Sequence, residues 1–90
     1  MEFRVLDECV EIEGAGVILF ASEEDSLKLG QGCVIRDIRG NAHTVDSVSI
    51  HEGLGSLYLR SGNAAYFQRL FRDIFVDATL FTADGVNENR

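Results

Sequence analysis

The sequence predicts an all-β fold, a small closed six-stranded β-barrel with one short helix packed on it. The chain has nine glycines and no proline, so its turns depend on residues that reach positive φ. The segments between the glycines are rich in Val, Ile, Leu and Phe and have the roughly 8 to 12 residue spacing of short strands. Closure is expected because a β protein without proline has few other means to protect its sheet edges.

The first two predicted strands form a hairpin. Apolar and acidic side chains alternate over residues 3–12, with one slip near Asp7. The glycine-rich segment 14–16 predicts a hairpin turn rather than a dinucleotide-binding loop, since Leu19 stands where the third glycine belongs. Residues 17–21 are apolar on both pleat faces, so this strand should be covered on each side.

The middle of the chain predicts two more strands. Residues 22–26 contain three consecutive acidic residues and predict a solvated turn. A cation site is not expected, because the side chains of three consecutive residues point in different directions. A strand over 27–35 follows, and Gly40-Asn41 turns the chain into a strand over 42–50. The even spacing breaks at residues 46–47, which predicts a bulge.

The last third contains the predicted helix. Leu57 and Leu59 should point inward, with Tyr58 and Arg60 at the solvent. Residues 64–74 carry apolar side chains at helical spacing, capped by Asn63 or Ser61, and the doubly apolar strand is one candidate surface for this helix to cover. A closing strand is expected over 76–80. The domain organisation is then a barrel over 1–82 and a polar tail over 83–90.

Charge and composition exclude several classes of function. Fifteen acidic and eight basic residues give a net charge of −7, which disfavours binding to nucleic acid by phosphate neutralisation. A protein or ribonucleoprotein partner is therefore favoured over free nucleic acid. The absence of a membrane-length apolar run and of an export signal predicts a cytoplasmic protein. We expect the protein to be a monomer or a homodimer. Cys9 and Cys33 are expected to be reduced core thiols, with a disulfide between strands as the alternative.

Three stretches together resemble the second domain of elongation factor Tu and its relatives, the translation-factor β-barrel. They are Ile12-Glu13-Gly14-Ala15-Gly16-Val17, Leu27-Lys28-Leu29-Gly30-Gln31-Gly32-Cys33-Val34-Ile35 and the strand over 45–50. Gln31 and Gly32 depart from the family pattern, as does the helix over 64–74. The resemblance implies a barrel that contacts tRNA or the ribosome beside a GTP-hydrolysing domain, but this chain has no phosphate-binding loop and its single lysine, Lys28, precedes Leu29.

We therefore expect a stand-alone, non-catalytic interaction module without cofactor or metal, accessory to translation or to a larger assembly. No spacing in the sequence supplies a nucleophile with an oriented base. The candidate interaction surface comprises five side chains: Arg36, Arg39, Arg60, His51 and Tyr58. The three arginines would form a cationic spot for a phosphate or carboxylate if their turns share one barrel end; pairing with Asp37 and Glu52 is the simpler interpretation.

Two alternatives remain open at this stage. His51 lies next to the inward Ile50 and should face water, so a phosphocarrier-like or small-ligand-binding protein using His51 is the second hypothesis, whereas His43 should face inward. Self-association through a sheet edge, or through exposed Tyr58 and Phe81, is the third.

Overall fold

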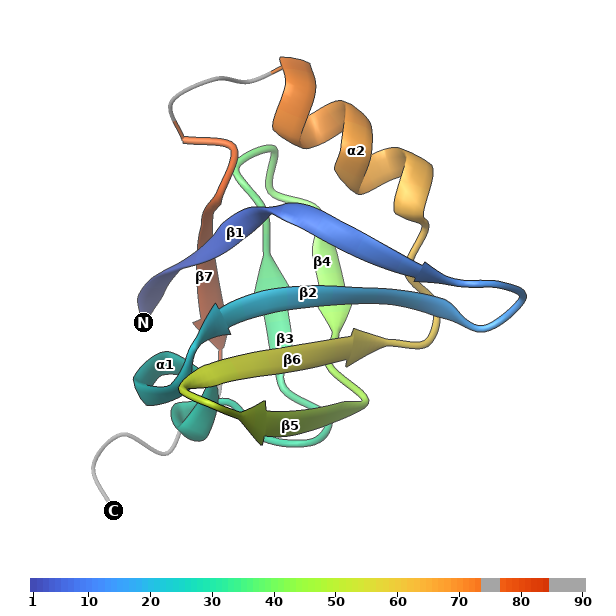
Figure 1. The fold of residues 1–90 in the computed structure, drawn as a ribbon. Helices are drawn as coiled ribbons and strands as arrows, with labels where there is room; N and C mark the ends of the chain where they lie inside the picture. Colours follow the sequence, from blue (N-terminus) through green and yellow to red (C-terminus); the bar gives the residue numbers. More distant parts are fainter. Residues whose placement is uncertain (74–76, 85–90) are drawn as a thin grey trace.

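An antiparallel sheet of seven strands, with two helices against it, makes up the described part of the protein (Figure 1). The computed structural model describes residues 1–73 and 77–84. The order across the sheet is β4-β3-β7-β1-β2-β6-β5. The elements are β1 (Glu2–Ile12), β2 (Gly16–Ser22), α1 (Glu23–Lys28), β3 (Val34–Arg36), β4 (Ala42–Thr44), β5 (Ser47–His51), β6 (Leu54–Leu59), α2 (Ala64–Asp73) and β7 (Leu80–Asp84).

The prediction of a mostly β fold is confirmed. The closed six-stranded barrel is wrong, because the seven-stranded sheet stays open. Its edge strands, β4 and β5, do not pair with each other although only Val45 and Asp46 join them. The Val45 N–H donates to Cys33 O, whereas the Asp46 N–H donates to Tyr58 O, so consecutive residues bond to opposite ends of the strand order. This corner takes the place of the bulge expected at 46–47. Figure 1 shows β4 nearly upright and β5 nearly horizontal, so the two edges diverge.

The β1–β2 hairpin agrees with the sequence. The pairing register shifts between Val5 and Cys9, at the predicted slip. Residues 13–15 form the turn, and β2 then begins at Gly16, whose φ is +116°. A Cβ at Gly16 would overlap the backbone carbonyl of Leu59, so only glycine lets β2 approach β6 there.

The acidic segment after β2 is the helix α1 rather than the solvated turn expected. Ser22 caps it, accepting a hydrogen bond from the Asp25 N–H, and three acids in its first turn complement the positive end of the helix. Ser26 is fully buried against Gly55 of β6, where any Cβ would overlap its side chain. Because α1 extends to Lys28, the strand expected over 27–35 is reduced to β3.

The helix α2 confirms the predicted helix over the residues that the structure describes. The Asn63 side chain accepts a hydrogen bond from the Tyr66 N–H, as a cap should. Phe67 and Leu70 are fully buried. The helix lies beside β1 and extends over the core (Figure 1) and does not cover the outer side of β2, so that side of the strand is left open.

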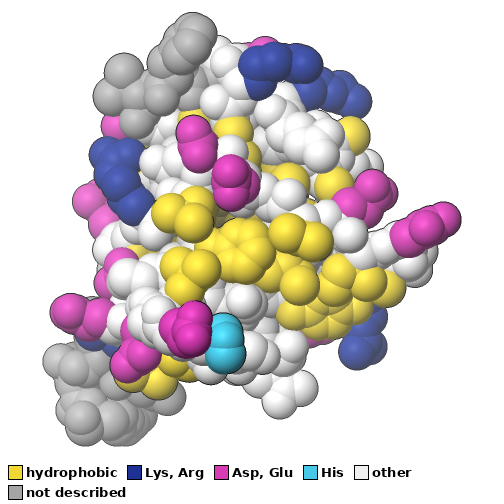
Figure 2. Space-filling model, viewed as in Figure 1, with side chains coloured by type: hydrophobic (Ala, Val, Ile, Leu, Met, Phe, Trp, Pro, Cys, Tyr) yellow, Lys and Arg dark blue, Asp and Glu magenta, His cyan; other side chains and the backbone are white. Residues whose placement is uncertain are grey.

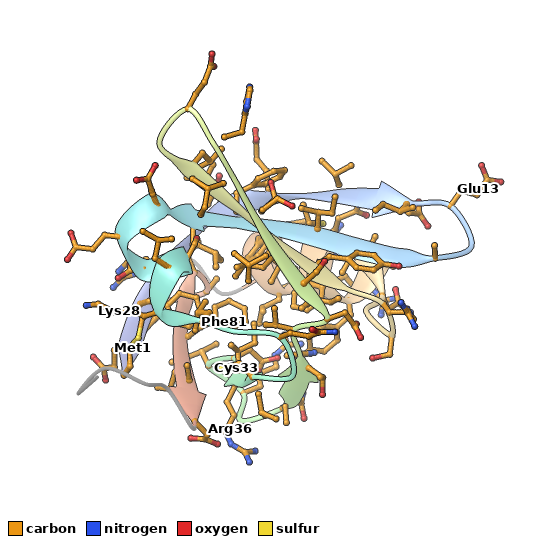
Figure 3. The ribbon with its side chains drawn as sticks, turned by 90° about the horizontal axis from the view of Figure 1, so that it is seen from below. Met1, Glu13, Lys28, Cys33, Arg36 and Phe81 are labelled. Atoms are coloured by element: carbon orange, nitrogen blue, oxygen red, sulfur yellow. The ribbon has the colours of Figure 1, made fainter. Side chains whose placement is uncertain are left out.

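The strand β7 begins later than the sequence predicts. Of the strand expected over 76–80, residue 76 lies outside the described residues and 77–79 form a turn. β7 pairs with β1 and with β3 and continues through Ala83 and Asp84, which the sequence analysis assigned to the tail. Phe81 is fully buried, and Figure 3 shows it among the interior side chains. Self-association through an exposed Phe81 is therefore wrong.

The core lies on the concave side of the sheet. Val17, Leu19, Leu57 and Leu59 are all at most 1% exposed, as the alternation of their strands predicts. Both cysteines are free thiols, and burial raises the pKa of each. Neither described helix has the length and apolar character that a membrane crossing requires.

The turn between β5 and β6 yields the first prediction. Glu52 and Gly53 both have positive φ, 52° and 82°, the pattern of a two-residue turn that favours Asn-Gly. We expect Glu52→Asn to raise the free energy of unfolding by ~0.5–1 kcal/mol, because asparagine tolerates this backbone conformation better than glutamate. Urea denaturation at pH 7 measures the change. Glu13→Asn, which removes the same charge in another turn at ordinary φ, should change stability less; equal changes would contradict the argument.

Candidate functional site

The outer side of the sheet carries an apolar surface, which we call the apolar face. Its central row joins Val10 of β1, Ile18 of β2 and Tyr58 of β6, which are direct neighbours across the strands. Leu6 and Val10 are 46% and 47% exposed. Figure 2 shows hydrophobic side chains as a continuous patch over the middle of the molecule. The apolar face consists of Leu6, Val10, Ile12, Ile18, Phe20, Leu54 and Tyr58.

Acidic side chains surround the apolar face on several sides (Figure 2). Asp7 and Glu8 stand between Leu6 and Val10 in the chain, and Glu52 closes the turn before Leu54. All three carboxylates belong to exposed residues. The site is thus an apolar centre with a mostly acidic rim, although Arg72 of α2 lines the same hollow as Asp7, Glu8 and Val10. A surface of this kind attracts a complementary, mostly positive one.

Two of the predicted site residues lie at this face. Tyr58 belongs to it, and its hydroxyl donates to Ala15 O, which holds the half-buried ring in place. His51 ends β5 opposite Leu54. Its side chain is 87% exposed, and its Nε2 lies 3.9 Å from a Glu52 carboxylate oxygen. The sequence predicted both as solvent-facing, and the structure places them on the same side of the sheet.

The three predicted arginines do not form one cationic spot. Arg36 makes an exposed ion pair with Asp84, 3.1 Å from Nε to the carboxylate, and projects outward in Figure 3. It lines a hollow with Lys28, whereas Arg60 lines a different one near the start of α2. Arg39 lies in the β3–β4 turn. The arrangement gives a phosphate or carboxylate no combined site from these residues.

A second polar cluster, centred on Asp37, was not singled out by the sequence. The Asp37 side chain is fully buried between the β3–β4 turn and α2. Its Oδ1 accepts the backbone N–H groups of Arg39 and Asn41, at 2.9 and 3.1 Å. Its Oδ2 accepts hydrogen bonds from His43 Nε2, at 2.9 Å, and from the Tyr66 hydroxyl. The only sequence signal was an aspartate opening a turn that contains Gly40.

The electrostatics of the Asp37 cluster indicate a structural role, in which Asp37 connects the β3–β4 turn to α2. Burial alone raises the pKa of Asp37, but the hydrogen bonds from His43, Tyr66, Asn41 and Arg39 outweigh it and hold the pKa below its ordinary value of 3.8. Burial and the bond to Asp37 raise the pKa of Tyr66. An ionised Asp37 only accepts, so His43 Nε2 carries the hydrogen. The Asp37 carboxylate accepts four hydrogen bonds, and these bonds hold the β3–β4 turn against α2. Little hydrogen-bonding capacity of the carboxylate is left for a substrate.

The described residues contain no group of three or more His, Cys, Asp or Glu side chains arranged to hold a metal ion. Comparison of the chain with protein-family models, with curated proteins and with solved structures gives no match. The functional argument therefore depends on the surface chemistry of the chain itself.

Proposed function

We propose that this protein is a non-catalytic interaction module that binds a partner protein through the apolar face. The observation that carries the proposal is the contiguous set of apolar side chains on the outer side of β1, β2 and β6, two of them almost half exposed. Grouped apolar side chains of this kind, with a polar rim, are typical of protein-binding surfaces. Phe20 and Tyr58 supply the aromatic anchors that contribute most at such surfaces.

The acidic rim supports a partner with basic residues around its own apolar contact. A second copy of this chain would bring two negative rims together, and each copy carries a net charge of −7. Like charges facing each other across an interface disfavour that pairing. The partner we expect is a basic protein, accessory to translation or part of another large assembly.

Removing the exposed apolar groups of the face should abolish partner binding without unfolding the protein. Leu6 and Val10 are the variants of choice, because their exposure means that the core does not depend on them. We expect tagged Leu6→Gln/Val10→Gln protein to lose a partner that the unsubstituted chain retains after purification from its own cells. Quantitative mass spectrometry of the bound proteins measures the loss.

The matched control is Leu27→Gln. Leu27 is 68% exposed on α1. The helix packs on the concave side of β6, where Ser26 contacts Gly55, so Leu27→Gln removes an exposed apolar side chain that is not part of the apolar face. Binding of the partner to the control should persist and should weaken as salt is added, because the rim attraction is screened. Equal retention by face and control variants, or a homodimer in sedimentation that the face variant dissociates, would overturn the proposal.

A further inference from the structure

The edge strand β5 is open to pairing. Its residues Ser47–His51 contain no Lys, Arg, Asp, Glu, Pro or Gly, so it lacks the usual devices that prevent strands from adding to an edge. Within residues 1–73 and 77–84, the hydrogen bonds between its backbone and other segments go to β6. Its opposite edge therefore presents the unpaired N–H and C=O groups of alternate residues.

The side chains of β5 favour an apolar neighbour on one side. Val48 and Ile50 point to the concave side of the sheet, opposite Leu57 and Gly55 of β6. Ile50 is nevertheless 37% exposed, and Val48 is half-buried, because no strand lies beyond β5 to cover them. Alternate side chains of an added strand would lie on that same side and cover both.

The ends of β5 are acidic. Asp46 precedes the strand and Glu52 follows it. Glu52 occupies a left-handed turn position that favours asparagine or glycine, so the chain carries a carboxylate here at a cost in backbone energy. A positively charged residue at the end of an added strand would pair with this carboxylate.

The other edge of the sheet is less suited to the same role. β4 has only three residues, Ala42–Thr44, and its central His43 is held by Asp37. Strand addition gains affinity from each added pair of backbone hydrogen bonds, so the longer β5 offers more.

We propose that β5 binds an extended segment of a partner protein by strand addition. The segment carries apolar side chains at alternate positions, which cover Val48 and Ile50, and Arg or Lys at the end that meets Glu52. This surface is the edge of the sheet and shares only Glu52 with the rim of the apolar face, so the protein can engage a partner through both.

The test uses a synthetic heptapeptide, Arg-Val-Thr-Val-Thr-Val-Arg, titrated into the isotopically labelled protein. We expect amide shifts and slowed hydrogen exchange at Ser47–His51. A peptide with the same side chains but with alternate backbone amides N-methylated should bind at least about tenfold more weakly, because it can no longer donate to the edge. A peptide with Glu at both ends should also bind about tenfold more weakly.

Protein variants separate the edge from the face. Glu52→Asn should weaken binding of the Arg-ended peptide while raising stability, and the Glu13→Asn control should do neither. Leu6→Gln/Val10→Gln protein should bind the peptide unchanged, which keeps this result independent of the proposed function. Absence of binding up to the solubility limit, equal binding of the N-methylated peptide, or protection centred on β4 instead of β5 would overturn the proposal.

Discussion

Replacement of Phe67 by alanine is expected to lower the free energy of unfolding by about 3 to 5 kcal/mol. Phe67 is fully buried on α2, and its ring centroid lies 4.8 Å from that of His43, 5.3 Å from that of Tyr66 and 6.5 Å from that of Phe81. It is thus the side chain through which α2 joins β4 and β7. Its removal leaves a cavity that these rings, and that of Phe71 at 6.3 Å, cannot fill without moving.

Urea denaturation measures the loss, and Phe71→Ala is the matched control. Phe71 lies one helical turn further along α2 and is only half-buried, so its truncation removes the same number of atoms with a smaller transfer and cavity cost. A loss for Phe67→Ala no larger than the loss for Phe71→Ala would show that α2 is not anchored as described.

Local patterns predicted most elements but not their assembly. The spacing of Phe67 and Leu70 predicted α2, and the slip near Asp7 predicted the irregular register of β1, because both are properties of neighbouring residues. The open sheet depends on the direction the chain takes after Val45, where consecutive N–H groups bond to opposite ends of the strand order. Alternation of side chains carries no information about such a corner, so the break at 46–47 was interpreted as a bulge.

Replacement of Asp37 by alanine should cost about 3 kcal/mol at pH 7, because it leaves His43, Tyr66 and two backbone N–H groups without their acceptor. The loss should depend on pH. Since the pKa of Asp37 is lower in the folded protein than its ordinary value of 3.8, its stabilisation is complete above that value and is lost as the pH falls through the folded pKa. The difference between the two proteins therefore shrinks in acid.

Urea denaturation of both proteins between pH 2 and pH 7, on the order of six points, measures this dependence. Asp84→Ala is the control, because its ion pair with Arg36 is exposed and should contribute less than about 1 kcal/mol. A difference between Asp37→Ala and the unsubstituted protein that stays constant down to the lowest pH would contradict an ionised, hydrogen-bonded Asp37.

The candidate site was predictable only in part, because it also depends on how the strands are assembled. Alternation along single strands placed Tyr58 and His51 outward, but the apolar face is defined by which strands lie side by side. Leu6, Val10 and Ile18 meet Tyr58 only because β2 lies between β1 and β6. The helix α2, for which β2 was one candidate surface, lies beside β1 instead, and the apolar face is left uncovered. The sequence predicts Asp37 only as an ion-pair partner of the arginines; its hydrogen bond from Tyr66 was not predictable, because Tyr66 is 29 residues away in the chain.

Because β7 lies between β3 and β1, the seven-stranded sheet cannot be completed before β7 is in place. Until residues 80–84 have been synthesised, β4-β3 on one flank and β1-β2-β6-β5 on the other have no strand connecting them. Pairing between β1 and β7, which are far apart in the sequence, is slow, because the whole intervening segment must close first. Until β7 pairs with both β1 and β3, the two flanks therefore leave the aliphatic interior accessible to water and to chaperones.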